Sequence, residues 1–214
     1  MNTENTVPAQ RHTILFIVSA PSGTGKTSLC SEVARTVPEL CFSISHTTRP
    51  PRPGEKNGVE YYFVSREEFR RYLAEHTMAE WTEIYGNCYG TSTETIQRVL
   101  DSGCDIIFDI DERGARQLVS AYPDSVTILI LPPSLAELKK RLTERGTDDP
   151  SSISKRLKRA QQEIEAMSWY QYVVINDKFA DAVSDLTAII RAERCTRNHP
   201  IITSIVANDS QTAE

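Results

Sequence analysis

A phosphate-binding loop is the feature that most constrains the fold of this chain. Residues 20–27 read Ala-Pro-Ser-Gly-Thr-Gly-Lys-Thr, directly after the apolar run 14–18 and before a segment with helical periodicity. In such a P-loop a buried parallel strand delivers the loop, and glycines let backbone N–H groups curl around a phosphate at the positive end of the next helix. Ala20 replaces the usual first glycine, and alanine is its smallest substitute. The pattern predicts an α/β fold of the P-loop NTPase type.

The residue types in this loop indicate ATP and Mg²⁺ as ligands. Lys26 is expected to reach the β- and γ-phosphates, and the Thr27 hydroxyl is expected to ligate Mg²⁺. The alternative is an ordinary strand-turn-helix connection, but the strand and helix patterns on both sides argue against it. The predicted ATP-binding residues of the loop are Ala20, Pro21, Ser22, Gly23, Thr24, Gly25, Lys26, Thr27 and Ser28.

Charge and cysteine content limit the other classes of function. The 214 residues carry a net charge of −5 with the basic residues spread along the chain, which does not favour nucleic acid as a partner. The five cysteines are odd in number and form no C-x-x-C pair, so we expect thiols in a reducing cytoplasm. No segment has the pattern of a secretion signal or transmembrane length, so we expect no membrane partner. The length suits one α/β domain with insertions. The sequence does not distinguish a monomer from a homodimer, and we expect one of the two.

The order of elements follows from apolar runs and helix caps. Apolar runs at 14–19, 106–109, 126–131 and 173–175 alternate with helical material, which predicts a parallel sheet flanked by helices. Three pairs with the serine/threonine-x-x-glutamate spacing predict helix starts near 66, 92 and 135; they are Ser65 with Glu68, Thr91 with Glu94, and Ser134 with Glu137. Apolar stripes predict two further helices, one with Ile153, Leu157, Ala160, Ile164 and Met167, and one with Ala182, Leu186, Ile189 and Ile190.

Two segments break this alternation and predict a division of the domain. The first is rich in turn residues and then contains a short aromatic strand at 60–64 and a helix, which is typical of a small α+β insertion. The second is charged and contains the break Gly-Thr-Asp-Asp-Pro at 146–150, which suits a mobile lid. We predict one domain over 13–194, with core segments 13–44, 92–140 and 161–194, an insertion at 45–91, a lid at 141–160, and terminal tails at 1–12 and 195–214.

Two arginines in the insertion suit a second phosphate. Arg49 and Arg52 lie in an extended, proline-rich stretch, and the prolines lower the entropic cost of presenting both guanidinium groups to one anion. A solvated surface loop is the alternative. The neighbouring insertion and the P-loop together favour the phosphate clamp.

Several motifs of the chain resemble those of guanylate kinases, and the resemblance spans residues 13 to 194. The motifs are Ser-His-Thr-Thr-Arg-Pro-Pro-Arg-Pro-Gly-Glu at 45–55, Gly-Val-Glu-Tyr-Tyr-Phe at 58–63, Gly-Asn-Cys-Tyr-Gly-Thr at 86–91, and Asp-Ile-Asp at 109–111. The resemblance implies that ATP phosphorylates GMP to GDP by direct in-line transfer. It implies that GMP is bound by Ser45, Arg49, Arg52, Glu55, Tyr61, Glu80, Tyr89, Gly90, Thr91 and Asp109. In this set Arg49, Arg52, Tyr61 and Tyr89 hold the phosphate, and Ser45, Glu80, Thr91 and Asp109 read the base.

The chemistry of guanine agrees with two of these assignments. Guanine presents N1–H and N2–H₂ donors along one edge, and Glu80 and Asp109 are carboxylate acceptors. Adenine has an unprotonated N1 there and would leave a buried carboxylate unpaired. An exposed acid at a helix end is the alternative for Glu80.

Two aspartates at a strand end suit a metal site. Asp109 and Asp111 follow the apolar run at 106–108, where α/β proteins bind ligands, and alternation points both carboxylates to one side. We expect Asp111 to be the better placed to support Mg²⁺, directly or through water. Glu112 and Arg113 depart from the family pattern, so the role of this turn stays open. Cys88, where relatives often have tyrosine, is expected to alter only packing.

The charged segment after 140 suits transition-state stabilisation. Arg141 and Arg145 are four residues apart on one helical face, and Arg156 follows the break; all three match lid arginines of the family. Phosphoryl transfer needs positive charge at the transferring oxygens and exclusion of water. We therefore predict Lys26, Arg141, Arg145 and Arg156 as catalytic residues, with a solvated charged helix as the alternative for the arginines. Asn176 resembles a family contact to the ATP adenine, although Asn-Asp is also a common turn.

Two other functions compete with a guanylate kinase. A catalytically inactive guanylate-kinase-like protein-interaction module would predict a decayed P-loop, whereas Gly23, Gly25, Lys26 and Thr27 are all present. A kinase for another nucleoside monophosphate would not need the acceptors Glu80 and Asp109. The sequence therefore favours the active enzyme.

Overall fold

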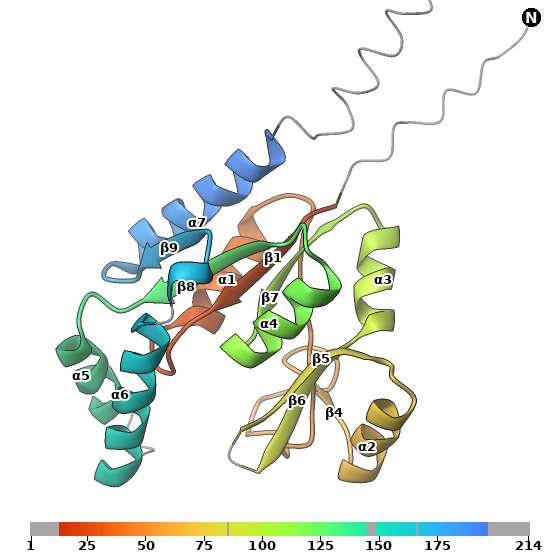
Figure 1. Ribbon diagram of the computed structural model, residues 1–214, viewed down its shortest axis with the longest axis horizontal. Helices are drawn as coiled ribbons and strands as arrows, with labels where there is room; N and C mark the ends of the chain where they lie inside the picture. The colour runs from red at the N-terminus through yellow and green to blue at the C-terminus, as the bar shows by residue number, and fades with distance from the viewer. Residues whose placement is uncertain (1–12, 85, 145–148, 166, 197–214) are drawn as a thin grey trace, which may run out of the picture.

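A five-stranded parallel sheet forms the centre of the structure, a computed structural model that describes residues 13–84, 86–144, 149–165 and 167–196 (Figure 1). Its strands lie in the order β2-β7-β1-β8-β9 and every pair is parallel. They comprise β1 (Leu15–Ser19), β2 (Leu40–Phe42), β7 (Asp105–Asp109), β8 (Val126–Leu131) and β9 (Tyr172–Ile175). The predicted fold class, a parallel α/β sheet of the P-loop type, is confirmed.

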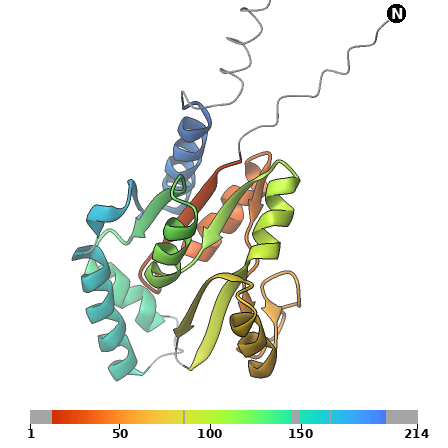
Figure 2. The ribbon, with the colours of Figure 1, turned by 45° about the vertical axis from the view of Figure 1, so that its right-hand side comes forward.

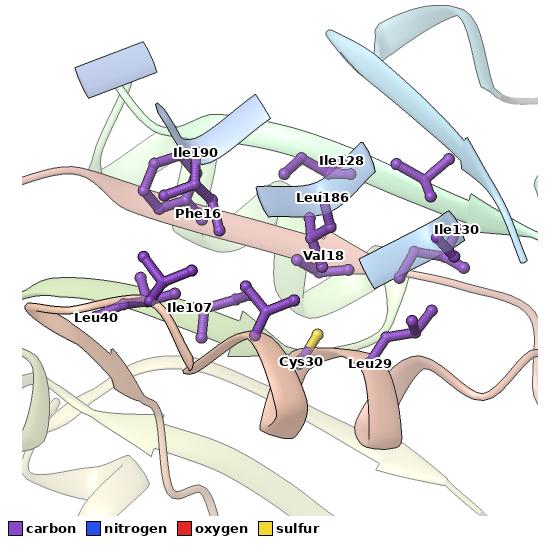
Figure 3. Packing of buried hydrophobic residues seen from close by; sticks show 14 of the residues in the cluster. Phe16, Val18, Leu29, Cys30, Leu40, Ile107, Ile128, Ile130, Leu186 and Ile190 are labelled. Atoms are coloured by element: carbon purple, nitrogen blue, oxygen red, sulfur yellow. The ribbon is translucent and has the colours of Figure 1, made fainter. Parts of the chain in front are cut away.

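Helices bury both faces of this sheet, which explains why its central strands are almost purely apolar. On one face α1 (Lys26–Thr36) and α7 (Phe179–Arg194) cover a core that Figure 3 shows, with Phe16 and Val18 facing Leu186 and Ile190. On the other face α3 (Thr93–Asp101) and α4 (Glu112–Ala121) cover Ile17, Ile106 and Phe108. All carboxyl ends of the strands meet at one edge, where the P-loop follows β1.

The segment 45–92 builds a separate four-stranded sheet beside that edge (Figure 2). Its order is β4-β3-β6-β5, with β3 (His46–Thr47), β4 (Tyr62–Phe63), β5 (Met78–Ile84) and β6 (Asn87–Ser92), and α2 (Arg66–Ala74) lies between β4 and β5 in the chain. Strand β5 is an open edge, and the Gln117 side chain of α4 pairs with it like a neighbouring strand. The Trp81 N–H donates to Gln117 Oε1 at 3.1 Å, and Gln117 Nε2 donates to the Trp81 carbonyl at 2.8 Å. This pairing ties the second sheet to the core.

The helix pair α5–α6 extends from the opposite side of the central sheet (Figure 1). Helices α5 (Leu135–Glu144) and α6 (Pro150–Glu165) share a small apolar core of Leu138, Leu142, Ile153 and Ala160, and the 3₁₀ turn η1 (Met167–Trp169) follows α6. Helix α6 continues through the expected lid boundary at residue 160. No helix in the described ranges has the length and apolarity needed to span a bilayer.

Three expected details differ in the structure. Ser92, rather than Thr91, caps α3 and accepts from the Thr95 N–H, because Thr91 is drawn into the core by another partner. The strand expected at 60–64 is only Tyr62–Phe63, since just His46 and Thr47 pair with it. Met167 lies beyond the end of α6 and is exposed, so the apolar stripe of that helix stops short of it. The caps expected at Ser65 and Ser134 are confirmed.

Candidate functional site

A cavity of about 550 Å³ lies where the P-loop, the second sheet and the α5–α6 pair meet. It brings together all nine predicted P-loop residues with predicted residues from the second sheet and its loops, from the α5–α6 pair, and from the junction of β7 and α4. The latter are Ser45, Arg52, Tyr61, Glu80, Tyr89, Asp109, Asp111, Arg141 and Arg156. The predicted residues that do not line it are Arg49, Glu55, Gly90, Thr91 and Asn176. Arg145 lies outside the described residues.

The P-loop turns where two glycines adopt positive φ. Gly23 has φ 96° and Gly25 has φ 87°, conformations that side chains with a Cβ rarely adopt. Space is also short, because a Cβ on Gly23 would come within 2.8 Å of the Leu142 side chain on α5. Gly25 is the N-cap of α1, so the loop leaves the first N–H groups of the helix facing the cavity. The loop therefore has the backbone geometry of an anion site.

Lys26 and Thr27 face the end of β7. The Lys26 ammonium lies 2.7 Å from Asp109 Oδ1 and also donates to the Ile110 carbonyl, while the Thr27 hydroxyl donates to Asp109 Oδ2. Asp109 thus offsets the lysine charge in a cavity wall where both side chains are largely shielded from solvent. The Thr27 hydroxyl and the Asp109 carboxylate therefore stand next to each other, beside the P-loop.

Asp111 has different neighbours from those expected at a strand end. Strand β7 ends at Asp109, and Asp111 is the N-cap of α4, so its Oδ1 accepts from the Gly114 N–H at 3.0 Å. Its Oδ2 accepts from Thr82 Oγ1 at 3.3 Å and from Arg159 Nη2 at 3.2 Å. The carboxylate beside Thr27 is therefore Asp109, whereas Asp111 faces the second sheet and α6.

Glu80 is a buried acid at the wall of the second sheet. Only 2 % of the residue is exposed, and Oε1 accepts from Thr91 Oγ1 at 2.7 Å, with Ser45 Oγ 3.3 Å from that hydroxyl. Burial raises the pKa of Glu80 to about 7, and the negative charge of Asp111 adds to the rise, although the Thr91 hydrogen bond opposes it. Such an acceptor, buried and held in place by Thr91, is suited to a ligand that brings N–H donors.

The two predicted phosphate arginines have different surroundings. Arg49 is bound by Glu55 at 2.9 Å and lies 5.4 Å from the centre of the Tyr61 ring, which also contacts Tyr89 edge-on. The hydrogen bond between the two side chains raises the pKa of Arg49 and lowers the pKa of Glu55. Arg52 lines the cavity itself. In this structure one arginine therefore faces the cavity, and the other is held behind it by Glu55 and the aromatic rings.

The α5–α6 pair contributes basic groups from the far side of the cavity. Arg156 Nη1 donates to Ser22 Oγ of the P-loop at 2.7 Å. Arg141 is held by Glu137 at 3.0 Å and donates to the Asn176 carbonyl at 2.9 Å. These contacts place both guanidinium groups along the cavity that the P-loop borders.

The side chain of Asn176 supports the P-loop. It is buried, and its Nδ2 donates to the Thr24 carbonyl at 2.6 Å. A Cβ on Gly25 would approach this amide to 2.8 Å. Asn176 therefore stabilises the P-loop through the Thr24 carbonyl and does not line the cavity.

Five cavity residues were missed by the sequence reasoning. They are Thr82, Ile84, Ile110, Arg159 and Glu163. A signal existed for four of them: Thr82 and Ile84 alternate with Glu80 along one strand face, and Arg159 and Glu163 follow Arg156 at steps of three and four on a helix. The apolar stripe of α6 predicts only its buried face, and Arg159 and Glu163 lie on the other side of the helix.

The donor set suits a metal that is shared with a ligand. In the described ranges no cluster of three or more His, Cys, Asp and Glu side chains could hold a metal ion by protein groups alone. The Thr27 hydroxyl and the Asp109 carboxylate instead offer hard oxygen ligands beside the P-loop. Mg²⁺ commonly takes few protein ligands and completes its shell with phosphate oxygens and water, which fits this arrangement.

Comparison with known proteins identifies the relatives of the chain. The guanylate kinase family model matches residues 12–193. A guanylate kinase of Geobacter metallireducens is 48 % identical over 186 residues, covering 87 % of this chain and 92 % of that protein. A guanylate kinase of Shewanella violacea is 49 % identical over 183 residues, covering 85 % and 88 %. The crystal structure of guanylate kinase from Anaplasma phagocytophilum superposes with a TM-score of 0.71 at 32 % identity, covering 88 % and 89 %.

Proposed function

Because the chain belongs to the guanylate kinase family, we infer that it is an enzyme that phosphorylates GMP to GDP with ATP. The observation that carries this inference is that one cavity holds both an intact P-loop and the buried acceptor Glu80. We further propose that transfer is direct and in line, without a phosphorylated enzyme intermediate. The residue roles below are part of the same proposal.

The donor half binds ATP through residues 20–28. Backbone N–H groups of the loop and the start of α1 surround the phosphates, and Lys26 turns from Asp109 toward the β- and γ-phosphates when ATP enters. Asn176 supports this half by bracing Thr24, and its predicted contact to the adenine is retained as a proposal.

The acceptor half binds GMP on the second sheet. Arg52, Arg49, Tyr61 and Tyr89 hold its phosphate, with Glu55 orienting Arg49 and Gly90 leaving room between the strands. Glu80, Thr91, Ser45 and Asp109 read the guanine edge. A charged acceptor at Glu80 matches the N1–H and N2–H₂ donors of guanine and disfavours adenine.

Transfer requires the two phosphates to meet along one line and the developing charge to be offset. Arg141 and Arg156 supply positive charge from the α5–α6 pair, and Arg145 is proposed to act with them. We propose that residues 141–160 act as a lid that excludes water. Mg²⁺ would be held by Thr27, with Asp109 beside it and Asp111 in support, directly or through water, and it would supply positive charge that offsets the charge of the phosphates.

The proposed architecture divides the domain into a core (13–44, 92–140 and 161–194), a GMP-binding insertion (45–91) and the lid. A cytoplasmic location and a monomeric or homodimeric state stay predictions from the sequence.

A coupled nucleotide assay tests the function. Purified protein with ATP and Mg²⁺ is offered GMP, dGMP, AMP, UMP and CMP in parallel, and ADP formation is measured. We expect transfer to guanine nucleotides and at least about a hundredfold lower efficiency with the other bases, as a mismatched polar site implies. Comparable rates with AMP would contradict the assignment of the acceptor, and no transfer to any nucleotide would contradict the enzyme.

A further inference from the structure

Helix α6 carries two arginines on one face, and they contact opposite halves of the cavity. Arg156 and Arg159 are three residues apart and are therefore neighbours on the helix surface. Arg156 Nη1 reaches Ser22 Oγ on the P-loop at 2.7 Å, and Arg159 Nη2 reaches Asp111 Oδ2 at 3.2 Å. A single turn of α6 thus contacts both the donor loop and Asp111, the N-cap of α4, whose side chain faces the second sheet.

The partner of Arg159 is fixed in place by the core. The Asp111 side chain is only 13 % exposed and also accepts from the Gly114 N–H and the Thr82 hydroxyl. Thr82 lies two residues after Glu80 on β5, so both side chains share one strand face. A continuous set of contacts therefore joins α6 to the wall that holds Glu80.

The Arg159 side chain is also held by a residue of its own helix. Its Nε donates to Glu163 Oε1 at 2.9 Å, one helical turn further on. Its side chain is 41 % exposed, so the contact with Asp111 can break without unfolding any element. Asp111 is thus fixed by its hydrogen bonds, whereas Arg159 is oriented by Glu163 but can leave Asp111. Such a pair can form and break reversibly, and we call it a latch.

We propose that Arg159 is a positioning residue that latches the lid to the acceptor half through Asp111. This role rests on the proposed function. Arg159 would act indirectly, by keeping Arg156 in place and by keeping water out of the cavity. With the latch closed, α6 holds Arg156 over the P-loop. With the latch lost, transfer slows and ATP exposed to water is hydrolysed more often.

Three variants and one matched control test this latch. Arg159→Gln and Asp111→Asn each remove one partner, the double variant removes both, and asparagine at 111 can still cap α4. Lys158→Gln removes the same charge from an exposed neighbour on the same helix. For Arg159→Gln we expect kcat to fall about tenfold, KM for GMP and ATP to change by less than about twofold, and GMP-independent ATP hydrolysis to rise relative to transfer. Lys158→Gln should match the wild type.

The double variant decides whether the two residues act together. If they form one latch, it should be no slower than the slower single variant. Fully additive losses would overturn the proposal. A raised KM with unchanged kcat in Arg159→Gln would also overturn it, because Arg159 would then bind a phosphate directly.

A measurement without nucleotide separates this proposal from the function itself. Hydrogen exchange of the α6 amides is compared for the free wild type, Arg159→Gln and Lys158→Gln. Faster exchange across 150–165 in Arg159→Gln alone supports the latch even if no transfer to GMP is found. Equal exchange in all three proteins overturns it even if the enzyme is active.

Discussion

Gly114 lies directly against the Glu80 carboxylate, and a Cβ placed on this glycine would approach Glu80 Oε2 to 2.4 Å. Gly114 is in the first turn of α4, and its N–H is already held by Asp111. The glycine is thus required for space, since its helical backbone makes no demand for positive φ. It forms part of the wall that fixes where Glu80 can stand.

Gly114→Ala should therefore displace Glu80 and weaken GMP selectively. We expect KM for GMP to rise about tenfold or more, the cost of one misplaced charged hydrogen bond, while KM for ATP stays nearly constant. Steady-state kinetics measure both constants. Glu80→Asp shortens the acid and makes room, so the double variant should bind GMP no worse than Glu80→Asp alone; simple additivity would argue that the two residues do not compete for space.

Lys26→Ala should abolish transfer while the fold and GMP binding remain. The Lys26 ammonium bonds Asp109 and the Ile110 carbonyl at the cavity wall, and Lys26 is not part of a buried apolar cluster in the described residues, so its loss opens no core cavity. Removal of a transition-state contact of several kcal/mol corresponds to about a thousandfold in kcat. Lys140→Ala, an exposed lysine on α5, is the control and should retain activity. Near-normal turnover of Lys26→Ala would contradict the P-loop assignment.

Arg52→Ala should weaken GMP binding by roughly 1.5–3 kcal/mol and leave ATP binding nearly unchanged, because only the acceptor phosphate loses a charge-assisted contact. Calorimetric titration with each nucleotide measures the two effects. Arg49→Ala should also lower thermal stability, since the largely shielded Glu55 carboxylate loses its guanidinium partner and keeps the Arg52 N–H as a donor. Equal weakening of ATP and GMP would show that these arginines serve another ligand.

The sequence predicts the two nucleotide half-sites but not the partner of every side chain. The P-loop glycines act locally, so their pattern is visible in the residues, whereas Glu80 is assigned only through the resemblance to guanylate kinases. The neighbours of Asp109 and Asp111 depend on the residue at which β7 ends and α4 begins. That boundary turns Asp111 into a helix cap, and no periodicity reveals it.

Contacts between segments that are distant in the chain cannot be predicted from the sequence pattern either. Gln117 completes the open edge of β5 by pairing with Trp81, 36 residues away in the chain. Arg159 meets Asp111 across 48 residues. Such pairs depend on how α4 and α6 are oriented against the second sheet, which tertiary packing decides. For the same reason the sequence does not reveal that the Asn176 side chain donates to the Thr24 carbonyl, whereas its contact to the adenine stays a prediction.

GMP recognition should depend on pH through Glu80. Burial raises the pKa of Glu80 to about 7, so the free enzyme loses its charged acceptor as the pH falls through 7. We expect kcat/KM for GMP to drop below pH 7, approaching tenfold per pH unit, and this dependence should vanish in Glu80→Gln. A profile that is the same in the wild type and the variant would assign the titration to another group.

The same shift has a consequence of opposite sign for stability. A carboxyl group whose pKa is raised by folding binds its proton more tightly in the native state, so its contribution is present below about pH 4.5 and is lost as the pH rises through 7. Glu80→Gln should therefore melt at a higher temperature than the wild type at pH 8, and the advantage should shrink toward pH 5. Calorimetric Tm values at the two pH values measure it. A loss of stability in the variant at pH 8 would mean that ionised Glu80 has favourable partners in the free protein.

Base choice is the most direct consequence of a buried acceptor at this wall. Glu80→Gln keeps an oxygen that accepts from guanine N1–H but loses the charge, and its amide adds donors that adenine N1 can use. The efficiency with GMP should fall by about tenfold or more, since a hydrogen bond to a charged group contributes roughly 1.5–3 kcal/mol, and the preference for GMP over AMP should narrow.

Asp109→Asn is a less selective comparison, because Asp109 also contacts Lys26 and Thr27 and its loss should impair the use of ATP as well. Steady-state constants for GMP and AMP in the wild type and both variants separate the two effects. If the GMP/AMP ratio were unchanged in both, other residues would read the base, even though the chain would remain a kinase.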